Sequence, residues 1–320
     1  MPGMARCLVT RELPGPALQR LRSAHEVVVW QARLPPAPNE LAHAARDAEG
    51  LLTLLTDRVD AWLLEQLPRL RAVSNYAVGY DNVDLEAASR RGIPVGHTPD
   101  VLTDATADLT FALMLAAARR LPEALAAAKD GDWVTWEPAK FLGYEVRAAT
   151  LGILGFGRIG RAVADRAGGF AMRVLTASAR QGLSEPVKEL LREADFVSLH
   201  CPLTPETHHL IGAQALELMR PTAILINTAR GPIVDHHALK DALERGQIAA
   251  AALDVTEPEP LPAGDPLLQT PNLIITPHIG SATRAARERM ADLAVDNLLA
   301  ALDGRQMPHQ ANHIPALGAA

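Results

Sequence analysis

The sequence predicts an α/β protein with two doubly wound parallel-sheet domains. Three observations predict this. Short apolar runs alternate with helical patterns along the chain, which favours parallel sheets. The runs form two series, one before residue 98 and one after residue 150. The length of 320 residues also exceeds the roughly 250–300 residues at which single hydrophobic cores stop growing.

The first series contains short runs that read as buried strands, with a helix over 16–23 following the first of them. The strands are expected at 7–9, 27–29, 51–55, 72–74 and 93–95. Pro94 is tolerable there because proline is accepted near a strand end. A first sheet is therefore complete by about residue 98.

A long apolar stretch over 105–120 predicts a buried helix, because leucine, methionine and phenylalanine occur almost all round it. Thr103 or Asp104 is the expected N-cap. Residues 131–145 then concentrate Trp133, Trp136, Phe141 and Tyr144 in a chain with only 4% aromatic residues. Such a concentration indicates an interface, and the alternative is a small local core.

A glycine-rich turn opens the second series. Residues 151–154 read as a strand, Gly155, Gly157 and Gly160 follow as G-x-G-x-x-G, and 161–167 look helical. In a strand–turn–helix unit, such glycines make the tight turn, the close approach to a pyrophosphate and the packing of helix on strand. The sequence therefore predicts a Rossmann-like dinucleotide site, in which Phe156, Arg158 and Ile159 also contact the cofactor.

The remaining pattern completes a second sheet and returns the chain to the first domain. Strands are expected at 173–176, 196–200, 223–227, 249–254 and 273–276, helices at 213–219, 237–244 and 284–302, and only a turn at 265–270. The chain thus crosses twice between domains. We expect one domain of residues 1–98 plus 283–320, a dinucleotide-binding domain of residues 99–282, and a cleft between them.

Composition excludes several classes of protein. The net charge is −6 without a basic run, which argues against nucleic acid as a partner. No apolar run approaches the roughly 20 residues that span a bilayer, and the N-terminus lacks the layout of a signal peptide. Cys7 and Cys201 form no disulfide framework and read as small core residues. We therefore expect a cytoplasmic protein without membrane or metal.

Polar residues follow three strands of the second sheet, and ligands of open α/β sheets bind outside the carboxyl ends of strands. Arg230 can bind a carboxylate bidentately, and His278 is a natural proton donor at neutral pH. Glu259 can orient the imidazole and favour its charged form. Together they suit hydride transfer to a 2-oxo acid. Asp254 is a candidate partner of the cofactor's ribose or amide.

The position after the second strand of the dinucleotide fold predicts the cofactor. NAD-specific folds place an acidic residue there to bind the ribose hydroxyls. Here Ser178, Ala179 and Arg180 occupy the position. Ser178 can donate a hydrogen bond to a 2′-phosphate, and Arg180 can pair with it. We expect NADPH to be preferred with NADH possible; the alternative is an ordinary solvated turn that is indifferent to the phosphate.

The chain resembles the D-isomer-specific 2-hydroxyacid dehydrogenases, most closely the glyoxylate/hydroxypyruvate reductases, over about residues 50–308. The resemblance rests on these segments: Asn-Tyr-Ala-Val-Gly-Tyr-Asp at 75–81, Thr-Pro-Asp-Val-Leu-Thr at 98–103, Leu-Gly-Phe-Gly-Arg-Ile-Gly at 154–160, His-Cys-Pro-Leu-Thr at 200–204, Asn-Thr-Ala-Arg-Gly at 227–231 and Pro-His-Ile-Gly-Ser at 277–281.

The resemblance implies roles for particular residues. Arg230 binds and polarises the substrate, His278 is the acid/base, and Glu259, not Glu257, supports the histidine. The backbone amides of Val78 and Gly79 hold the substrate carboxylate in a first-domain loop, and the family forms dimers through its nucleotide-binding domains. Further cofactor contacts are expected at Pro202, Thr207, Thr228, Ala229 and Gly280.

The chain departs from its relatives at two places. His97 stands where many relatives have Asn, and the stretch between Arg180 and Ala194 is shorter because it lacks an extra strand. We therefore expect a more open adenine side. The expected activity is NADPH-preferring reduction of glyoxylate or hydroxypyruvate. The alternatives are an NAD(H)-sensing co-repressor-like protein and a dehydrogenase of another D-2-hydroxy acid, such as 3-phosphoglycerate. Formate dehydrogenase is disfavoured because Glu259 replaces that branch's Gln.

Overall fold

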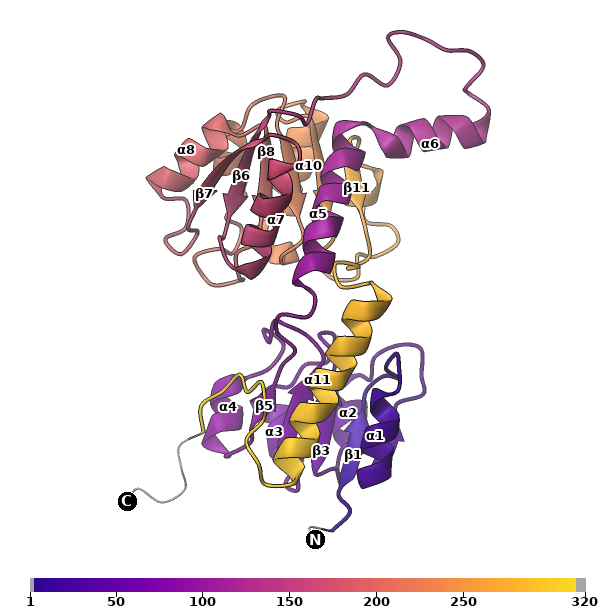
Figure 1. Cartoon of the computed structure of the whole chain (residues 1–320), viewed down its shortest axis with the longest axis vertical. Coiled ribbons are helices and arrows are strands. Elements are labelled where there is room, and N and C mark those ends of the chain that lie inside the picture. Colours follow the sequence, from indigo (N-terminus) through magenta and orange to yellow (C-terminus); the bar gives the residue numbers. More distant parts are fainter. Residues whose placement is uncertain (1–2, 315–320) are drawn as a thin grey trace. The chain divides into compact units, whose positions relative to one another are not determined.

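The computed structural model describes residues 3–314. The chain divides into two compact units (Figure 1). The terminal unit contains the described residues up to Leu102 and those from Ala282 onward, and the central unit is Thr103–Ser281. The chain passes from one unit to the other within four residues of the boundaries expected from the sequence, 98/99 and 282/283.

The terminal unit is built on a five-stranded sheet in the order β2-β1-β3-β4-β5, in which every pairing is parallel. Alternate strand residues face opposite cores: Cys7 packs with α1 and α11, and Leu8 packs with α2, α3 and α4. Helices therefore cover both faces. The elements are β1 (Arg6–Val9), α1 (Ala17–Ala24), β2 (Glu26–Val29), α2 (Pro38–Ala44), β3 (Gly50–Thr53), α3 (Ala61–Gln66), β4 (Ala72–Asn75), α4 (Leu85–Arg90), β5 (Val95–Gly96) and α11 (Arg284–Leu302).

The central unit has a six-stranded parallel sheet in the order β11-β10-β9-β8-β6-β7. Helices α5 and α7 pack on one face, and α8, α9 and α10 on the other. The elements are α5 (Thr103–Ala118), α6 (Leu121–Asp130), β6 (Thr150–Leu154), α7 (Arg158–Gly168), β7 (Arg173–Ala177), α8 (Glu185–Glu193), β8 (Phe196–Leu199), α9 (Ala213–Leu218), β9 (Ile224–Asn227), the 3₁₀ turn η1 (Gly231–Ile233), α10 (His236–Glu244), β10 (Ala250–Leu253), η2 (Pro266–Gln269) and β11 (Leu273–Ile275).

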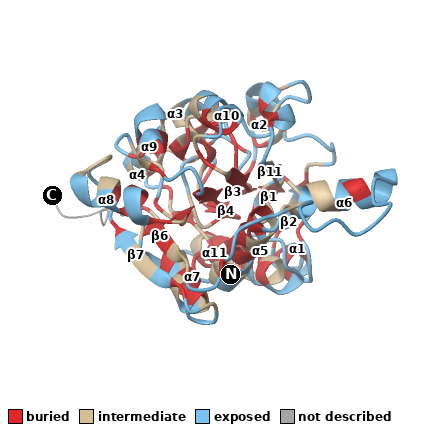
Figure 2. Cartoon of the chain, turned by 90° about the horizontal axis from the view of Figure 1, so that it is seen from above, coloured by how far each residue is buried: buried red, intermediate tan, exposed pale blue. Residues whose placement is uncertain are grey.

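The predicted fold class, two doubly wound parallel-sheet domains, is confirmed. In both units most residues of the strands are buried (Figure 2). The burial follows from the architecture, because a parallel sheet covered on both faces needs apolar side chains on both. The apolar runs of the sequence are the visible consequence of that requirement.

Several local expectations are wrong for identifiable reasons. The run at 93–95 yields a strand only at Val95–Gly96, because Pro94 has no N–H to donate. Neither Thr103 nor Asp104 is the N-cap, because α5 already begins at Thr103; Asp104 pairs instead with Arg166 at 3.1 Å. The turn expected at 265–270 contains the 3₁₀ helix η2.

The helix expected over 105–120 ends earlier, and a second helix follows that the sequence analysis missed. Arg120 adopts a left-handed conformation with φ of +52°, which ends α5, and α6 starts immediately with Pro122 in its first turn. Proline is favourable at that position because its missing N–H has no helical partner. Apart from Pro122, the Ala- and Leu-rich sequence carries no signal of the second helix.

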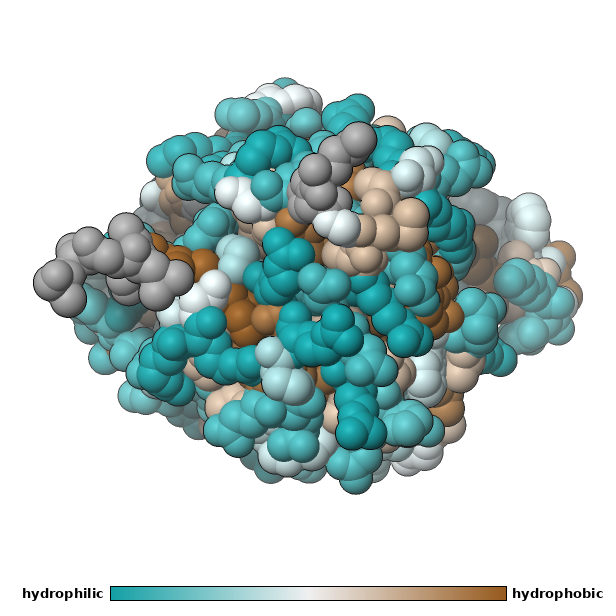
Figure 3. Space-filling view, turned by 90° about the horizontal axis from the view of Figure 1, so that it is seen from below, coloured by the Kyte–Doolittle hydropathy of each residue, from teal (hydrophilic) through white to brown (hydrophobic). Residues whose placement is uncertain are grey.

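Helix α6 and the aromatic segment 131–145 extend away from the sheet of the central unit (Figure 1). Trp133 and Trp136 are 73% and 79% exposed, and Val134 and Leu142 are also exposed. These side chains do not form the local core that was the alternative interpretation. By contrast, hydrophilic side chains predominate on the face of the molecule drawn in Figure 3.

Both cysteines are buried and free, as expected for small core residues. Burial raises the pKa of Cys7 to about 12 and that of Cys201 to about 11, so both are thiols at neutral pH. Within residues 3–314, no helix is both long and apolar enough to cross a membrane.

Candidate active site

Three adjacent strands carry the candidate catalytic residues. β9, β10 and β11 lie side by side in the sheet, and their last residues are in register: Asn227 with Leu253, and Leu253 with Ile275. Arg230, Glu259 and His278 follow these ends within a few residues. The sheet order therefore places all three on the same edge of the central unit, where ligands of such sheets bind.

His278 and Glu259 form a direct pair. His278 Nδ1 lies 2.5 Å from Glu259 Oε1, and both side chains are about 30% exposed, at 29% and 31%. Because a carboxylate can only accept, Nδ1 carries the proton of this bond. The Nε2 atom is therefore the nitrogen that can exchange a proton with a ligand. A weak bond from the Thr256 amide to Glu259 Oε2, at 3.4 Å, holds the carboxylate.

The buried carboxylate of Asp254 fixes the loop that carries His278. Its oxygens accept from the Thr276 hydroxyl at 2.6 Å, the Ile279 amide at 2.8 Å and the Gly280 amide at 2.7 Å. The His278 amide donates to the Asp254 carbonyl, and His278 itself adopts a positive φ of +53°. Asp254 thus positions the histidine through its backbone. Its contact with the cofactor remains a prediction.

The loop that carries Arg230 is fixed to its neighbours in the same way. Asn227 donates to the Arg230 carbonyl at 2.8 Å and accepts from the Ala229 amide at 3.0 Å. A Cβ at Gly231 would lie 2.0 Å from the carbonyl oxygen of Thr256. The Arg230 loop therefore touches the loop leading to Glu259, and only glycine permits that approach. The Thr228 hydroxyl lies 3.0 Å from that of Thr110 on α5.

The glycine turn has the shape that a pyrophosphate requires. Gly155 has φ of +98°, and a Cβ there would lie 2.5 Å from the Cys201 amide nitrogen. A Cβ at Gly160 would lie 2.3 Å from the Gly155 carbonyl oxygen. At Gly157, by contrast, an added Cβ would meet no atom within 4 Å outside its own local backbone. Gly157 also precedes α7 without a side-chain cap, so this open cradle at a helix N-terminus fits a bound dinucleotide.

The segment 178–180 follows β7 at the edge of the sheet next to the glycine turn. Leu154 and Ala177 are in register, and Gly155 donates to the Ala177 carbonyl at 3.1 Å. Ser178 and Arg180 are exposed, and Ala179 is buried. The segment contains no carboxylate that would repel a 2′-phosphate. After it the chain turns directly into α8, without an intervening strand, as its short length implies.

Thr207 stabilises its own turn through its hydroxyl, which the sequence analysis did not predict. Its hydroxyl donates to the Pro202 carbonyl at 2.7 Å and accepts from the Thr204 amide at 2.8 Å. Phe156 is 44% exposed beside the glycine turn, with the Arg161 guanidinium over its ring. Cofactor contacts at Pro202, Thr207 and Phe156 remain predictions.

Two residues hold the loop of the terminal unit that contains Val78 and Gly79. His97 Nδ1 lies 2.9 Å from the Val78 carbonyl, and the Asn75 side chain donates to the Gly79 carbonyl at 3.1 Å. His97 also meets the Tyr80 ring edge-on. The sequence analysis assigned no consequence to His97. The position of His97 could have indicated this contact, because residue 97 directly follows β5. That strand pairs with β4, which precedes the loop of Val78 and Gly79.

Comparisons with known proteins agree with this geometry. Residues 111–280 match the family described as D-isomer specific 2-hydroxyacid dehydrogenase, NAD binding domain. The chain is 47% identical to a glyoxylate reductase of Korarchaeum cryptofilum over 317 residues and 48% identical to one of Thermococcus gammatolerans over 320, each match covering 96% of both chains.

Solved structures show the same similarity. A protein of Thermus thermophilus is 52% identical with a TM-score of 0.90, the match covering 96% of this chain and 99% of that one. An NADPH-dependent glyoxylate/hydroxypyruvate reductase of Sinorhizobium meliloti, solved in complex with NADP and malonate, is 33% identical with a TM-score of 0.84, covering 97% of both chains.

Proposed function

We propose a specific activity for this chain, which belongs to the D-isomer specific 2-hydroxyacid dehydrogenase family and is an NAD(P)-dependent oxidoreductase of small 2-oxo acids. The proposed reactions are the NADPH-preferring reduction of glyoxylate to glycolate and of hydroxypyruvate to D-glycerate. The observation that carries the proposal is the His278–Glu259 pair. The loops that hold this pair follow β10 and β11, beside the Arg230 loop that follows β9, and they lie on the same edge of the sheet as the glycine turn.

Each of the three side chains has a defined task in the proposed reaction. Arg230 binds the substrate carboxylate, for which its guanidinium offers a planar pair of donors. The protonated His278 donates from Nε2 to the carbonyl oxygen as the carbon is reduced. Glu259 accepts from Nδ1, which fixes the ring orientation and stabilises the imidazolium before transfer. The bound nicotinamide cofactor supplies the hydride. The amides of Val78 and Gly79 are proposed as further carboxylate ligands.

Turnover tests the activity directly. The purified full chain is given NADPH with glyoxylate, hydroxypyruvate, pyruvate or 3-phosphohydroxypyruvate, and oxidation of NADPH is followed by absorbance. We expect the highest kcat/KM with glyoxylate or hydroxypyruvate. Higher efficiency with 3-phosphohydroxypyruvate would assign a different substrate. Binding of the dinucleotide without turnover of any 2-oxo acid would favour an NAD(H)-sensing binding protein.

The preference for NADPH is proposed from Ser178 and Arg180, which are exposed beside the glycine turn without a neighbouring carboxylate in their segment. We expect Ser178→Asp to move the preference toward NADH, because the added charge repels a 2′-phosphate. Arg180→Ala is expected to raise the KM for NADPH and leave that for NADH nearly unchanged. Arg245→Ala, at the exposed end of α10, is the matched control. Equal efficiency of the unmodified enzyme with both cofactors would contradict this part of the proposal.

A homodimer is proposed from the exposed apolar side chains of α6 and the aromatic segment. Leu121 and Leu125 on α6 are 46% and 59% exposed, in addition to the two tryptophans. Large exposed apolar patches mark interaction sites. Sedimentation velocity of the wild-type chain is expected to show a dimer, which Trp136→Ala weakens. The control is Trp62→Ala, a partly exposed tryptophan of the terminal unit. A monomeric wild-type protein would contradict the proposal. The expected cytoplasmic location stays a prediction.

A further inference from the structure

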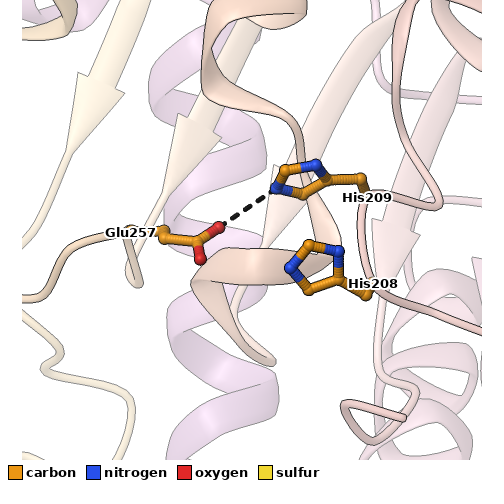
Figure 4. Close-up of side chains that lie close together, drawn as sticks. All are labelled: His208, His209 and Glu257. Carbon is orange, nitrogen blue, oxygen red and sulfur yellow. Dashed lines mark hydrogen bonds and ion pairs between the residues drawn. The ribbon is translucent and has the colours of Figure 1, made fainter. Parts of the chain in front are cut away.

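We propose that His208, His209 and Glu257 form a binding site for a divalent transition-metal ion, of which Zn²⁺ is the best probe. One possible ligand atom of each residue lies within 4.8 Å of those of the other two. Figure 4 shows the two imidazole rings lying over one another, with the carboxylate of Glu257 facing their edges. The site lies in the central unit and does not depend on the proposed function.

The distance between His209 and Glu257 already fits the geometry of a metal site. In tetrahedral zinc coordination, bonds of about 2.0–2.1 Å place the ligand atoms about 3.3 Å from one another. His209 Nε2 and Glu257 Oε2 are already 3.2 Å apart. The His208 and His209 rings are stacked with centroids 4.0 Å apart and an angle of 27° between their planes. An imidazole nitrogen binds a metal in the plane of its ring, so one of the two stacked rings must rotate for both to bind the same ion. All three residues are exposed, which leaves room for that rotation.

The backbone explains why two consecutive histidines face the same way. Consecutive side chains of a strand point to opposite faces, and those of a helix diverge. His209 instead lies in a turn with φ of +51°. The His209 amide donates to the Pro232 carbonyl at 2.8 Å, which anchors the turn to the segment that follows Arg230. That same segment contacts Thr256, directly before Glu257, through Gly231. Both sides of the site therefore rest on one framework.

The donor set selects the class of ion. Two imidazoles and one carboxylate suit Zn²⁺, Cu²⁺ or Ni²⁺. Mg²⁺ and Ca²⁺ prefer oxygen ligands throughout, and they are expected to bind poorly here. Three protein ligands also leave a coordination position for water, as in other two-histidine, one-carboxylate zinc sites. A bound ion would link the turn 205–209 to the loop after β10.

Zinc binding by the full chain tests the inference. Protein without a histidine tag is stripped with a chelator and titrated with Zn²⁺ against a chromophoric competitor. We expect one tight equivalent per chain and a rise in melting temperature with Zn²⁺, because a ligand that binds the folded state stabilises it. Mg²⁺ at the same concentration is expected to leave the melting temperature unchanged. Absence of a tight equivalent of Zn²⁺ would overturn the proposal.

Variants assign the binding to these side chains. Loss of a residue that only hydrogen-bonds to a metal ligand lowers metal affinity about 10–100-fold. Loss of a ligand itself should cost at least as much, so His209→Ala and Glu257→Gln should each weaken zinc binding by at least about tenfold. The exposed His43 of the terminal unit supplies the control variant His43→Ala, which should bind like the wild type. Circular dichroism confirms that each variant is folded. Unchanged affinity in both ligand variants would overturn the assignment.

Discussion

Two histidine–glutamate pairs take their glutamates from the loop that follows β10, and the two pairs differ in distance, exposure and surrounding contacts. Glu259 pairs with His278 at 2.5 Å, and Glu257, two residues earlier, pairs with His209 at 3.2 Å. The first pair is about 30% exposed, and the second is 43% and 42% exposed. The backbone of His278 is fixed by the buried Asp254 carboxylate, and a second imidazole, His208, is stacked on His209.

A histidine–glutamate pair alone therefore does not specify a function. A carboxylate that fixes one imidazole through Nδ1 leaves a single oriented Nε2, which suits proton transfer. A carboxylate beside two imidazoles offers three donor atoms close together, which suits a metal ion. The framework around each pair decides which chemistry is available. Variants that exchange or remove single partners can therefore separate the two roles.

The largest difference is expected from removing the histidine of each pair. His278→Ala should lower kcat for glyoxylate reduction by about 10²–10⁴-fold, the usual contribution of a general acid. His209→Ala should stay close to the wild-type rate in metal-free buffer, because the side chain lies in the other pair. Steady-state kinetics at saturating NADPH measure both. A similar loss of activity in the two variants would remove the functional distinction between the pairs.

The pH dependence of the reaction should separate the two glutamates. Reduction needs the protonated imidazole of His278, so its rate should fall as the pH rises and that proton is lost; oxidation of the hydroxy acid needs the neutral ring and should show the opposite trend. The Glu259 carboxylate stabilises the imidazolium. In Glu259→Gln, the alkaline decline of the reductive rate should therefore begin at lower pH.

Glu257→Gln is the matched control for this profile, since it makes the same change two residues away. Its reductive pH profile should overlay that of the wild type in metal-free buffer. If the Glu259→Gln profile does not move either, the proposed pairing has no role in proton transfer.

Asp254 tests whether the framework makes the difference. Asp254→Ala leaves one hydroxyl and two amides of the 276–280 loop without their acceptor. Each buried donor without a partner costs about 1–3 kcal/mol. We expect lower stability in urea unfolding and a lower kcat. Glu257→Ala, which removes an exposed carboxylate, should change stability by less than about 0.5 kcal/mol. Wild-type stability of Asp254→Ala would show that the loop is held by other contacts.

Much of this arrangement could be predicted from the sequence, because it follows from local patterns. In the sequence, Arg230 and His278 are visible as polar residues that follow apolar runs. Parallel strands bring the ends of such runs to one edge of the sheet. The choice of Glu259 over Glu257 came only from the family resemblance. Spacing alone cannot separate two glutamates in one loop.

The pair of His209 and Glu257 could not be predicted for a different reason. Their segments follow β8 and β10, which are separated in the sheet by β9, so only the tertiary fold brings them together. The start of α6 was missed as well, because Arg120, the left-handed residue before it, is neither glycine nor asparagine. The roles of Asp254 and His97 depend on hydrogen bonds between loops, which leave no periodic signal.

The smallest expected effect concerns a third histidine that has no carboxylate partner. His200 Nε2 lies 2.8 Å from the Ser198 hydroxyl, and desolvation lowers the pKa of His200 from 6.5 to about 4. The unfolded chain therefore binds this proton at higher pH than the folded chain does. The contribution of neutral His200 to stability is complete above about pH 6.5 and is lost as the pH falls toward 4. For these values the loss at pH 5.5 is about 1 kcal/mol.

Urea unfolding of the wild type and of His200→Gln at pH 7.5 and pH 5.5 measures this effect. Other groups titrate in both proteins and cancel in the difference. The wild type should lose about 1 kcal/mol more stability than the variant over this range. Equal losses would mean that His200 takes up its proton as readily in the folded chain as in the unfolded one. A larger loss in the variant would reverse the sign, and the folded state would then stabilise the imidazolium even without a carboxylate beside it.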